Sequence, residues 1–403
     1  MQTRKPDSAA RPTPRTRGGR QSAVGGRWPT LVAVLVVLAG LGGCGGEAAP
    51  VDDTVVLALA SPVSIPAYEG VQQAAEMAVD SINAAGGIDG RPVELLVRDD
   101  STSAQLAITI AAELVADPRV VAVVGHLNSA ATLAAAQVYN DPEHGLVNVS
   151  PASSAPAVSD AGPWTFRVTP SDLRHGPALA AWAYNRLGAR RATVLYSNDD
   201  YGRGLRTSFA DAFVGLGGRV LHADPYLPSL LEEDPDVTEP FLVRAIRDRT
   251  DVLVIAGQSA DGEVVLRTAR SAGYRGPVMG ADGLAGLRDA GPVARGVYVS
   301  SAWLPDGPAD ATQHFVATFE ARYGVVPDQF AAMTYDAIRL LAQAVDEVGT
   351  DRAAVREYLD RVGGEVSAFP GVTGEIAFDE NGDVPEKEVV IGVIRDGQLV
   401  TAG

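Results

Sequence analysis

The chain has 403 residues, of which 46% are hydrophobic, and its 50 acidic and 33 basic residues give a net charge of −17. Residues 1–43 hold seven of the basic residues and one of the acidic ones. The rest therefore carries 26 basic against 49 acidic residues, a net charge of −23. Such a charge disfavours nucleic acid and anionic membrane as partners, and a length above about 300 residues favours two lobes over a single core.

The N-terminal segment has the order of an export signal. Seven basic residues lie between positions 4 and 27, and residues 31–41 are almost entirely apolar. Small residues then precede Cys44, the only cysteine of the sequence. The apolar run is shorter than the roughly 20 residues that a membrane-spanning helix needs. We therefore expect a signal peptide over residues 1–43, with no permanent span.

Leu41-Gly42-Gly43-Cys44 resembles the lipobox of bacterial lipoproteins. The resemblance implies that Cys44 is acylated and becomes the first mature residue, with residues 44–53 as a tether. Two or more acyl chains would hold the protein stably on the membrane. The alternative is an unmodified cysteine in an ordinary signal peptide.

Strand and helix patterns alternate through the first half of the remaining chain. Compact apolar runs favour strands, and apolar residues at helical spacing favour helices between them. We expect strands at 55–60, 93–97, 120–124 and 146–149, and helices at 70–83, 104–116 and 130–139. This alternation predicts an α/β fold with a parallel sheet covered on both faces.

A second set of such units follows residue 168. It has expected helices at 176–187, 202–216, 241–247 and 262–272 and strands at 192–196, 220–223, 252–256 and 278–279. A strand at 297–300 and helices at 309–323, 331–348 and 352–362 come next. The pattern predicts a second doubly wound lobe. Strands at 374–378 and 389–395 around Asn381-Gly382 predict a closing hairpin.

Signatures of enzymes and metal sites are largely missing from the sequence. It has no Gly-x-Ser-x-Gly elbow, no Walker phosphate loop and no paired-histidine zinc helix. Its five histidines are scattered, and Asp379 to Asp383 resembles part of a calcium loop without the distal bidentate acid. We expect no enzyme activity, no cofactor and no metal.

Small polar residues follow two of the expected strands. Residues 125–130 contain Asn128 and Ser129, and residues 150–154 contain Ser153 and Ser154. Ligands of open parallel sheets bind at the carboxyl ends of strands, and exposed N–H groups beside a serine suit a carboxylate. The alternative is that Ser129 and Ser154 only cap helices.

A family resemblance rests on several motifs that occur in order over residues 54–400. They are residues 82–90, Asp99-Asp100, Val124-Gly125-His126, Ser150-Pro151-Ala152, Asp200-Tyr201-Gly202 and residues 371–383. The chain resembles the Leu/Ile/Val-binding group of type I periplasmic substrate-binding proteins. The resemblance implies two Rossmann-like lobes joined by three crossovers, built from residues 54–170 with 304–386 and residues 171–303 with 387–403.

The same resemblance implies a function. It predicts a receptor that delivers an amino acid or amide to an ABC transporter permease. Together with the lipobox, we expect a monomer that is lipid-anchored at the extracytoplasmic face of the cell membrane. A sensor for a membrane signalling partner and an exported enzyme remain as alternatives. The chain itself has no signalling domain.

The family's binding site carries over to individual residues. Ser129 resembles the serine that binds the ligand carboxylate, assisted by Ser154 and the backbone at Ala152, with Ser153 beside them. Tyr201 resembles the cleft tyrosine of the second lobe, and Asp282 falls where an acid pairs with the ligand ammonium. A solvated turn is the alternative for Asp282.

The sequence also departs from the family. Gly257-Gln258-Ser259 stands where aromatic residues are frequent, and the segment around Tyr68 is short. We include Tyr68 and Gln258 in the expected site, and expect a pocket more polar than one for leucine. Trp303 and Tyr335 could border the cleft, although large aromatic residues are more often part of a core.

Overall fold

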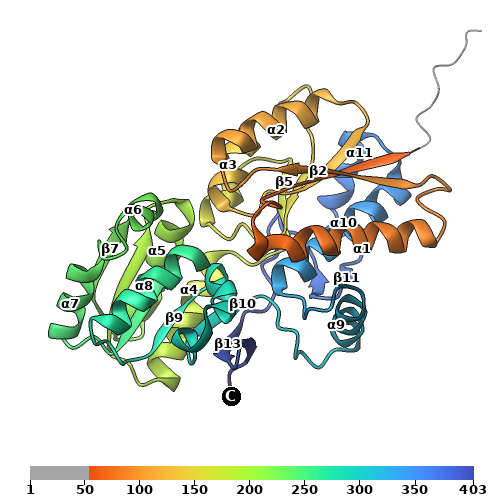
Figure 1. Cartoon of the computed structure of the whole chain (residues 1–403). Helices are drawn as coiled ribbons and strands as arrows, with labels where there is room; N and C mark the ends of the chain where they lie inside the picture. The colour runs from red at the N-terminus through yellow and green to blue at the C-terminus, as the bar shows by residue number, and fades with distance from the viewer. Residues whose placement is uncertain (1–53) are drawn as a thin grey trace, which may run out of the picture. The chain divides into compact units, whose positions relative to one another are not determined.

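A five-stranded parallel sheet forms the first half of the computed structural model, which describes residues 54–403 (Figure 1). Its strand order is β2-β1-β3-β4-β5. The strands are β1 (Val55–Ser61), β2 (Val93–Asp99), β3 (Val120–Gly125), β4 (Asn148–Ser150) and β5 (Thr165–Arg167). Between them lie η1 (Pro66–Tyr68), α1 (Glu69–Ala84), α2 (Ala104–Ala116), α3 (Ser129–Tyr139) and η2 (Pro156–Asp160). The expected alternation of strands and helices is confirmed here.

Alternation along β1 explains why helices cover both faces of this sheet. Val55, Leu57 and Leu59 belong to one apolar cluster with residues of α1 and of α10 (Gln329–Val348). Val56 and Ala58 belong to another cluster, with residues of α2 and α3. Because successive side chains of a strand point to opposite faces, an uninterrupted apolar strand needs a cover on each side. Figure 1 shows α2 and α3 on one side of the sheet and α1 and α10 on the other.

A seven-stranded sheet forms the second lobe, in the order β14-β13-β10-β9-β8-β6-β7. Its strands are β6 (Arg191–Ser197), β7 (Arg219–Tyr226), β8 (Val252–Ala256), β9 (Val278–Gly280), β10 (Tyr298–Ser301), β13 (Val390–Arg395) and β14 (Gln398–Thr401). The helical segments are α4 (Asp172–Ala181), the π-helical η3 (Trp182–Arg186), α5 (Asp200–Gly215), α6 (Pro228–Glu233), α7 (Glu239–Arg247), α8 (Ser259–Ser271) and η4 (Asp282–Ala294). β13 pairs antiparallel with both β10 and β14, and the other strand pairs of this sheet are parallel.

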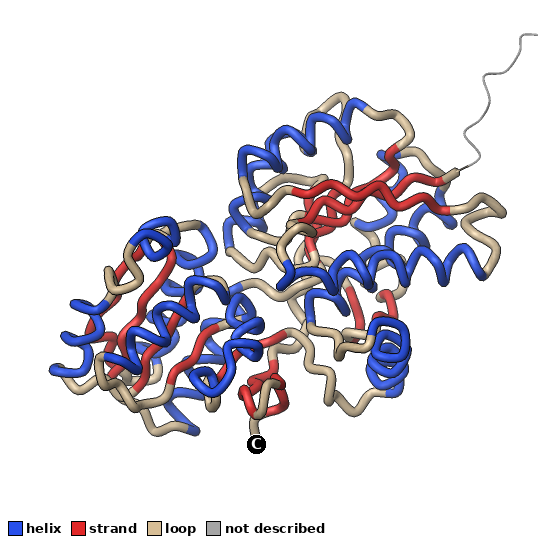
Figure 2. Tube along the Cα trace, in the orientation of Figure 1, coloured by secondary structure: helices blue, strands red, loops and turns tan. Residues whose placement is uncertain are grey.

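The chain passes between the two sheets three times. It leaves β5 for α4, leaves β10 for α9 (Asp310–Tyr323), and returns through residues 384–389 to β13. The second passage leads into α9, α10 and α11 (Arg352–Leu359), which add helices to the first lobe. Figure 2 shows these passages as tan loops between the two groups of strands. The predicted α/β fold with two doubly wound lobes and three crossovers is confirmed.

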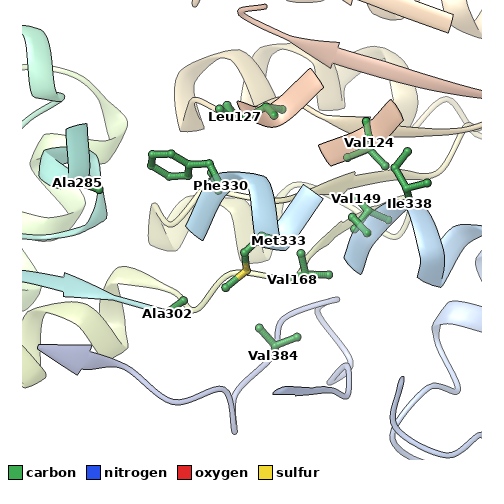
Figure 3. Packing of buried hydrophobic residues seen from close by; sticks show 14 of the residues in the cluster. Val124, Leu127, Val149, Val168, Ala285, Ala302, Phe330, Met333, Ile338 and Val384 are labelled. Carbon is green, nitrogen blue, oxygen red and sulfur yellow. The ribbon is translucent and has the colours of Figure 1, made fainter. Parts of the chain in front are cut away.

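Packing around α10 joins the first sheet to the crossovers. Figure 3 shows Val124, Val149, Ile338 and Met333 gathered in one apolar cluster. The cluster continues to Val384 near the third passage. The passages therefore start from a densely packed core, which restrains their ends.

The closing hairpin predicted around Asn381-Gly382 is wrong. β12 (Gly374–Ile376) pairs instead with β11 (Phe369–Gly371), and β13 joins the other sheet beside β10. The turn at Asp379–Asp383 exists, with Gly382 at a φ of +70°. An Asn-Gly turn signal reports local geometry, and tertiary contacts decide which strands pair.

Asp383 explains why this turn lies where it does. Its carboxylate accepts hydrogen bonds from Arg167 Nε at 2.6 Å and Arg167 Nη2 at 2.8 Å, and from Ser159 Oγ at 2.7 Å. The Arg167 side chain is fully buried. A buried guanidinium needs a charged partner, so the turn is held against β5 rather than in a hairpin.

Two further differences concern element boundaries. β4 begins at Asn148, two residues after the expected start, and the sequence patterns missed α6 and η4. Both missed segments are irregular or short, so their apolar periodicity is weak.

The predicted signal peptide, Cys44 and the tether to residue 53 lie outside the described residues. None of the helices within residues 54–403 combines the length and apolar character that crossing a bilayer requires.

Candidate functional site

One pocket lies where the carboxyl ends of strands from both sheets meet. It is lined by Tyr68, Leu127, Asn128, Ser129, Ala152, Tyr201, Gln258, Asp282, Gly283 and Phe330. All but Phe330 follow a strand: β1, β3, β4, β6, β8 or β9. Its cavity volume is about 20 Å³, room for about one water molecule, so the lining residues of the two lobes lie close together and a bound solute must separate them.

Six of the eight residues expected from the sequence line this pocket. They are Tyr68, Ser129, Ala152, Tyr201, Gln258 and Asp282. The other two, Ser153 and Ser154, are fully buried and lie behind it. Leu127, Asn128, Gly283 and Phe330 were missed, although Asn128 and Gly283 adjoin expected residues in the sequence.

Ser129 opens α3 but does not cap it. The cap position is Asn128, whose side chain makes no capping bond, and Ser129 Oγ accepts a hydrogen bond from the Ala155 N–H at 3.2 Å. The cap residue of α4 is Ser171, and Ser154 caps no helix. The helix-cap interpretation of Ser129 and Ser154 is therefore wrong.

A buried hydroxyl network holds the loop that carries Ser129. The His126 carbonyl accepts hydrogen bonds from Ser150 Oγ at 2.7 Å, Thr132 Oγ1 at 3.0 Å and Ser153 Oγ at 3.2 Å. The His126 ring contacts Asp100 at 2.6 Å, and both side chains are fully buried. Ser153 thus fixes the loop rather than facing the pocket.

Asp282 is the acidic group of the pocket and is not a solvated turn. It is 3% exposed, and its Oδ1 accepts from Tyr201 O–H at 3.1 Å and the Gly283 N–H at 2.9 Å. Within residues 54–403 no basic side chain pairs with it. Burial raises its pKa to about 7, while the bonds from Tyr201 and Gly283 act in the opposite direction.

Gly283 permits the close contact between Asp282 and Tyr201. A Cβ at position 283 would come within 2.6 Å of the Gly257 carbonyl oxygen and 2.8 Å of the Tyr201 hydroxyl. The Gly283 N–H also donates to the Tyr201 hydroxyl at 3.1 Å. Any larger residue here would push the tyrosine away from the carboxylate, since real Cβ atoms do not approach so closely.

Asp172 is a second buried acid near the pocket that sequence reasoning missed. It is fully buried at the start of α4, and neither carboxylate oxygen has a hydrogen-bond partner among the described residues. Burial, and then the charge of Asp282, raise its pKa well above the usual range. Asp172 therefore favours the neutral form, which leaves Asp282 as the charge that faces a ligand.

A larger groove of about 690 Å³ is lined partly by the second passage and the start of α10. Trp303 lines this groove and packs edge-to-face on Phe315, which also contacts Tyr335. The two aromatic residues thus lie outside the smaller pocket. Within residues 54–403, no group of three or more His, Cys, Asp or Glu side chains is placed so that it could hold a metal ion.

Two α/β lobes, three passages and a small pocket between strand ends define a two-lobed solute-binding protein. Residues 55–398 match the family model described as "Periplasmic binding protein". The chain belongs to this family, and its fold is that of the type I periplasmic binding proteins. The family implies an extracytoplasmic location.

Curated relatives agree with this assignment. The Leu/Ile/Val-binding protein of Escherichia coli (strain K12) is 27% identical over 336 residues, which cover 82% of this chain and 87% of that protein. A leucine-, isoleucine-, valine-, threonine- and alanine-binding protein of Pseudomonas aeruginosa is also 27% identical, with the same coverage. These relatives are binding proteins rather than enzymes.

Solved structures give the same result. An ABC transporter substrate-binding protein from Desulfitobacterium hafniense, in complex with Leu, superposes with a TM-score of 0.76 at 29% identity, covering 87% of this chain and 100% of that one. A leucine-binding protein from Thermotoga maritima gives 0.78 at 27% identity, covering 87% and 98%.

Proposed function

We propose that this protein captures an amino acid in the pocket between its lobes and delivers it to an ABC transporter permease. The observation that carries the proposal is Asp282, a buried carboxylate that has no basic partner within residues 54–403 and lines the same pocket as Ser129. A ligand ammonium would supply the missing partner. The names of the curated relatives and solved neighbours support an amino acid as the ligand.

The two ends of an amino acid fit the two sides of the pocket. Ser129 and the backbone at the start of α3 lie on the first lobe and offer hydrogen bonds to a carboxylate. Asp282 and Tyr201 lie on the second lobe and favour a cation. Because each lobe binds one end, the ligand would stabilise the arrangement in which both contacts form.

Calorimetry with a panel of amino acids and their amides tests this function. We expect at least one member to bind with 1:1 stoichiometry, and mass spectrometry of the purified protein to reveal a small zwitterion. Binding by no member, together with a different class of co-purified molecule, would refute the proposal.

Amino-acid affinity is expected to fall as the pH drops below about 7. The pKa of Asp282 is about 7, so its carboxyl is increasingly protonated below that value and must lose its proton to pair with an ammonium. Each pH unit below about 7 should then lower the affinity for the amino acid about tenfold. Calorimetry between about pH 8 and about pH 5.5 measures this slope, and a constant affinity over the range contradicts the role of Asp282.

In the ligand-free protein, the contribution of Asp282 to the free energy of unfolding should change with pH in the opposite direction to the ligand affinity. Asp282 keeps its proton in the folded state up to about pH 7, whereas the unfolded chain releases it near the usual value of 3.8. The folded state thus binds more protons between these values, so this group's contribution to the free energy of unfolding falls as the pH rises through them. Urea unfolding without ligand separates the two effects.

Lipid anchoring at Cys44 is part of the proposal. Cys44→Ala is expected to abolish incorporation of labelled fatty acid, because the substituted side chain has no thiol to acylate. Metabolic labelling with palmitate measures this directly, with the wild-type chain as the control. Equal labelling of the variant would place the lipid elsewhere or exclude a lipobox.

We also propose the lobe boundaries and the monomeric state that the sequence predicts. Residues 54–170 with 304–386 and residues 171–303 with 387–403 each contain one of the two large sheets. We propose that the protein works as a monomer with the permease as its protein partner. Affinity capture from membranes that returned a signalling kinase and no permease would favour the sensor alternative.

A further inference from the structure

Half of the pocket lining has no part in the contacts proposed for the ligand's ammonium and carboxylate. These residues are Tyr68, Leu127, Asn128, Gln258 and Phe330. The rings of Tyr68 and Phe330 pack edge-to-face, with centroids 6.0 Å apart. Leu127 lies in the loop that follows β3, and Phe330 lies at the start of α10 (Figure 3). This half is therefore available to contact the side chain of the ligand.

Two primary amides in this half have unused hydrogen-bonding capacity. Asn128 Oδ1 is closed off from solvent and has no partner among the described residues. The Gln258 side chain, at the cap position of α8, makes no capping bond and none to any other residue of the described part of the chain. Asn128 Oδ1 is buried, and an unsatisfied buried polar atom costs about 1–3 kcal/mol, so a ligand that donates a hydrogen bond to it is favoured. The half-buried Gln258 amide is free to exchange hydrogen bonds with a ligand.

The electrostatic environment favours a ligand side chain that donates hydrogen bonds. Burial raises the pKa of Tyr68 to about 12, and the charge of Asp261 acts in the same direction. Asp261 is 8% exposed, accepts a hydrogen bond from Tyr226, and has a pKa raised to about 6 by burial. Among the described residues, no basic side chain lines the pocket. A second ligand carboxylate would therefore meet acidic groups without a counter-charge.

We propose that the pocket selects an amino acid whose side chain ends in a primary amide, of the glutamine and asparagine type, and that Gln258 and Asn128 recognise that amide. The inference rests on the proposed amino-acid binding. An amide both donates and accepts, so it can exchange two hydrogen bonds with Gln258 and donate a further one to Asn128 Oδ1. The Tyr68 and Phe330 rings and Leu127 pack on its apolar stem.

Competition among amino acids of similar size tests the inference on the wild-type protein. We expect an amide-bearing amino acid to bind at least about 100-fold more tightly than leucine and than the acid of equal length, because a site that hydrogen-bonds a group rejects analogues lacking it. Equal or tighter binding of leucine overturns the inference while the amino-acid receptor stands. No binding by any amino acid overturns both.

The variant Gln258→Leu tests the recognising residue. It is expected to weaken binding of the amide ligand and strengthen binding of leucine, shifting their affinity ratio by at least about tenfold. Gln105→Leu, at an exposed position on α2, is the matched control and should leave the ratio unchanged. A ratio unaffected by Gln258→Leu overturns the assignment. If that variant does not fold, the wild-type competition still decides which side chain is preferred.

Discussion

Replacing Asp282 by asparagine is expected to weaken amino-acid binding by about 100-fold or more. Asp282 is 3% exposed and has no basic partner within residues 54–403, so its charge is available only to a ligand. Removing one partner of a buried, hydrogen-bonded charge pair costs about 2–5 kcal/mol. Calorimetry on the wild type and on Asp282→Asn measures the loss.

The same substitution should not destabilise the ligand-free protein. Burial raises the pKa of Asp282 to about 7, so the folded state disfavours the ionised carboxylate that asparagine removes. At about pH 8 we expect the variant to unfold at an equal or higher temperature than the wild type. Asp211→Asn, at an exposed position of α5, is the control and should bind normally. Unchanged affinity in a folded Asp282→Asn variant would remove this residue from the site.

Replacing Arg167 by methionine is expected to lower the free energy of unfolding by about 3–5 kcal/mol. The guanidinium is fully buried and donates to Asp383, to Ser159, and to the carbonyl oxygens of Ser153 and Ala155. Removing the cation leaves the Asp383 carboxylate without its counter-charge and the Ser153 carbonyl without a hydrogen-bond donor. Urea unfolding measures the change.

The Arg167→Met variant should also bind the ligand more weakly than the wild type. Ala155 donates its N–H to Ser129 Oγ, so loosening the segment held by Arg167 also loosens Ser129. Arg219→Met, an exposed arginine at the start of β7, should change the free energy of unfolding by less than about 0.5 kcal/mol. A similarly small change for Arg167→Met would show that the buried network contributes little.

Most of the fold could be predicted from the sequence because its strands are unusually clear. β1, β3 and β8 are uninterrupted apolar runs, since each is covered on both faces, and turn residues bound them. The C-terminal pairing could not be predicted from local patterns. The turn at Asn381-Gly382 is real, but the choice between β11, β10 and a hairpin depends on Arg167, which is more than 200 residues away in the sequence.

The candidate site could be predicted in part. Ser129, Tyr201 and Asp282 were found through family motifs, and their meeting in one pocket follows from strand order. Asp172 could not be found, because an acid at the start of a helix is ordinarily a solvated residue that favours the helix dipole. Phe330 was missed for a different reason, since an aromatic residue in an apolar helix is indistinguishable from core in the sequence.

A crystal structure of the protein with its co-purified ligand would show whether the two lobes bind the two ends of one molecule. We expect a zwitterion in the pocket, its carboxylate within hydrogen-bonding distance of Ser129 and its ammonium in contact with Asp282. A ligand bound away from both residues, or one without an ammonium group, would contradict it.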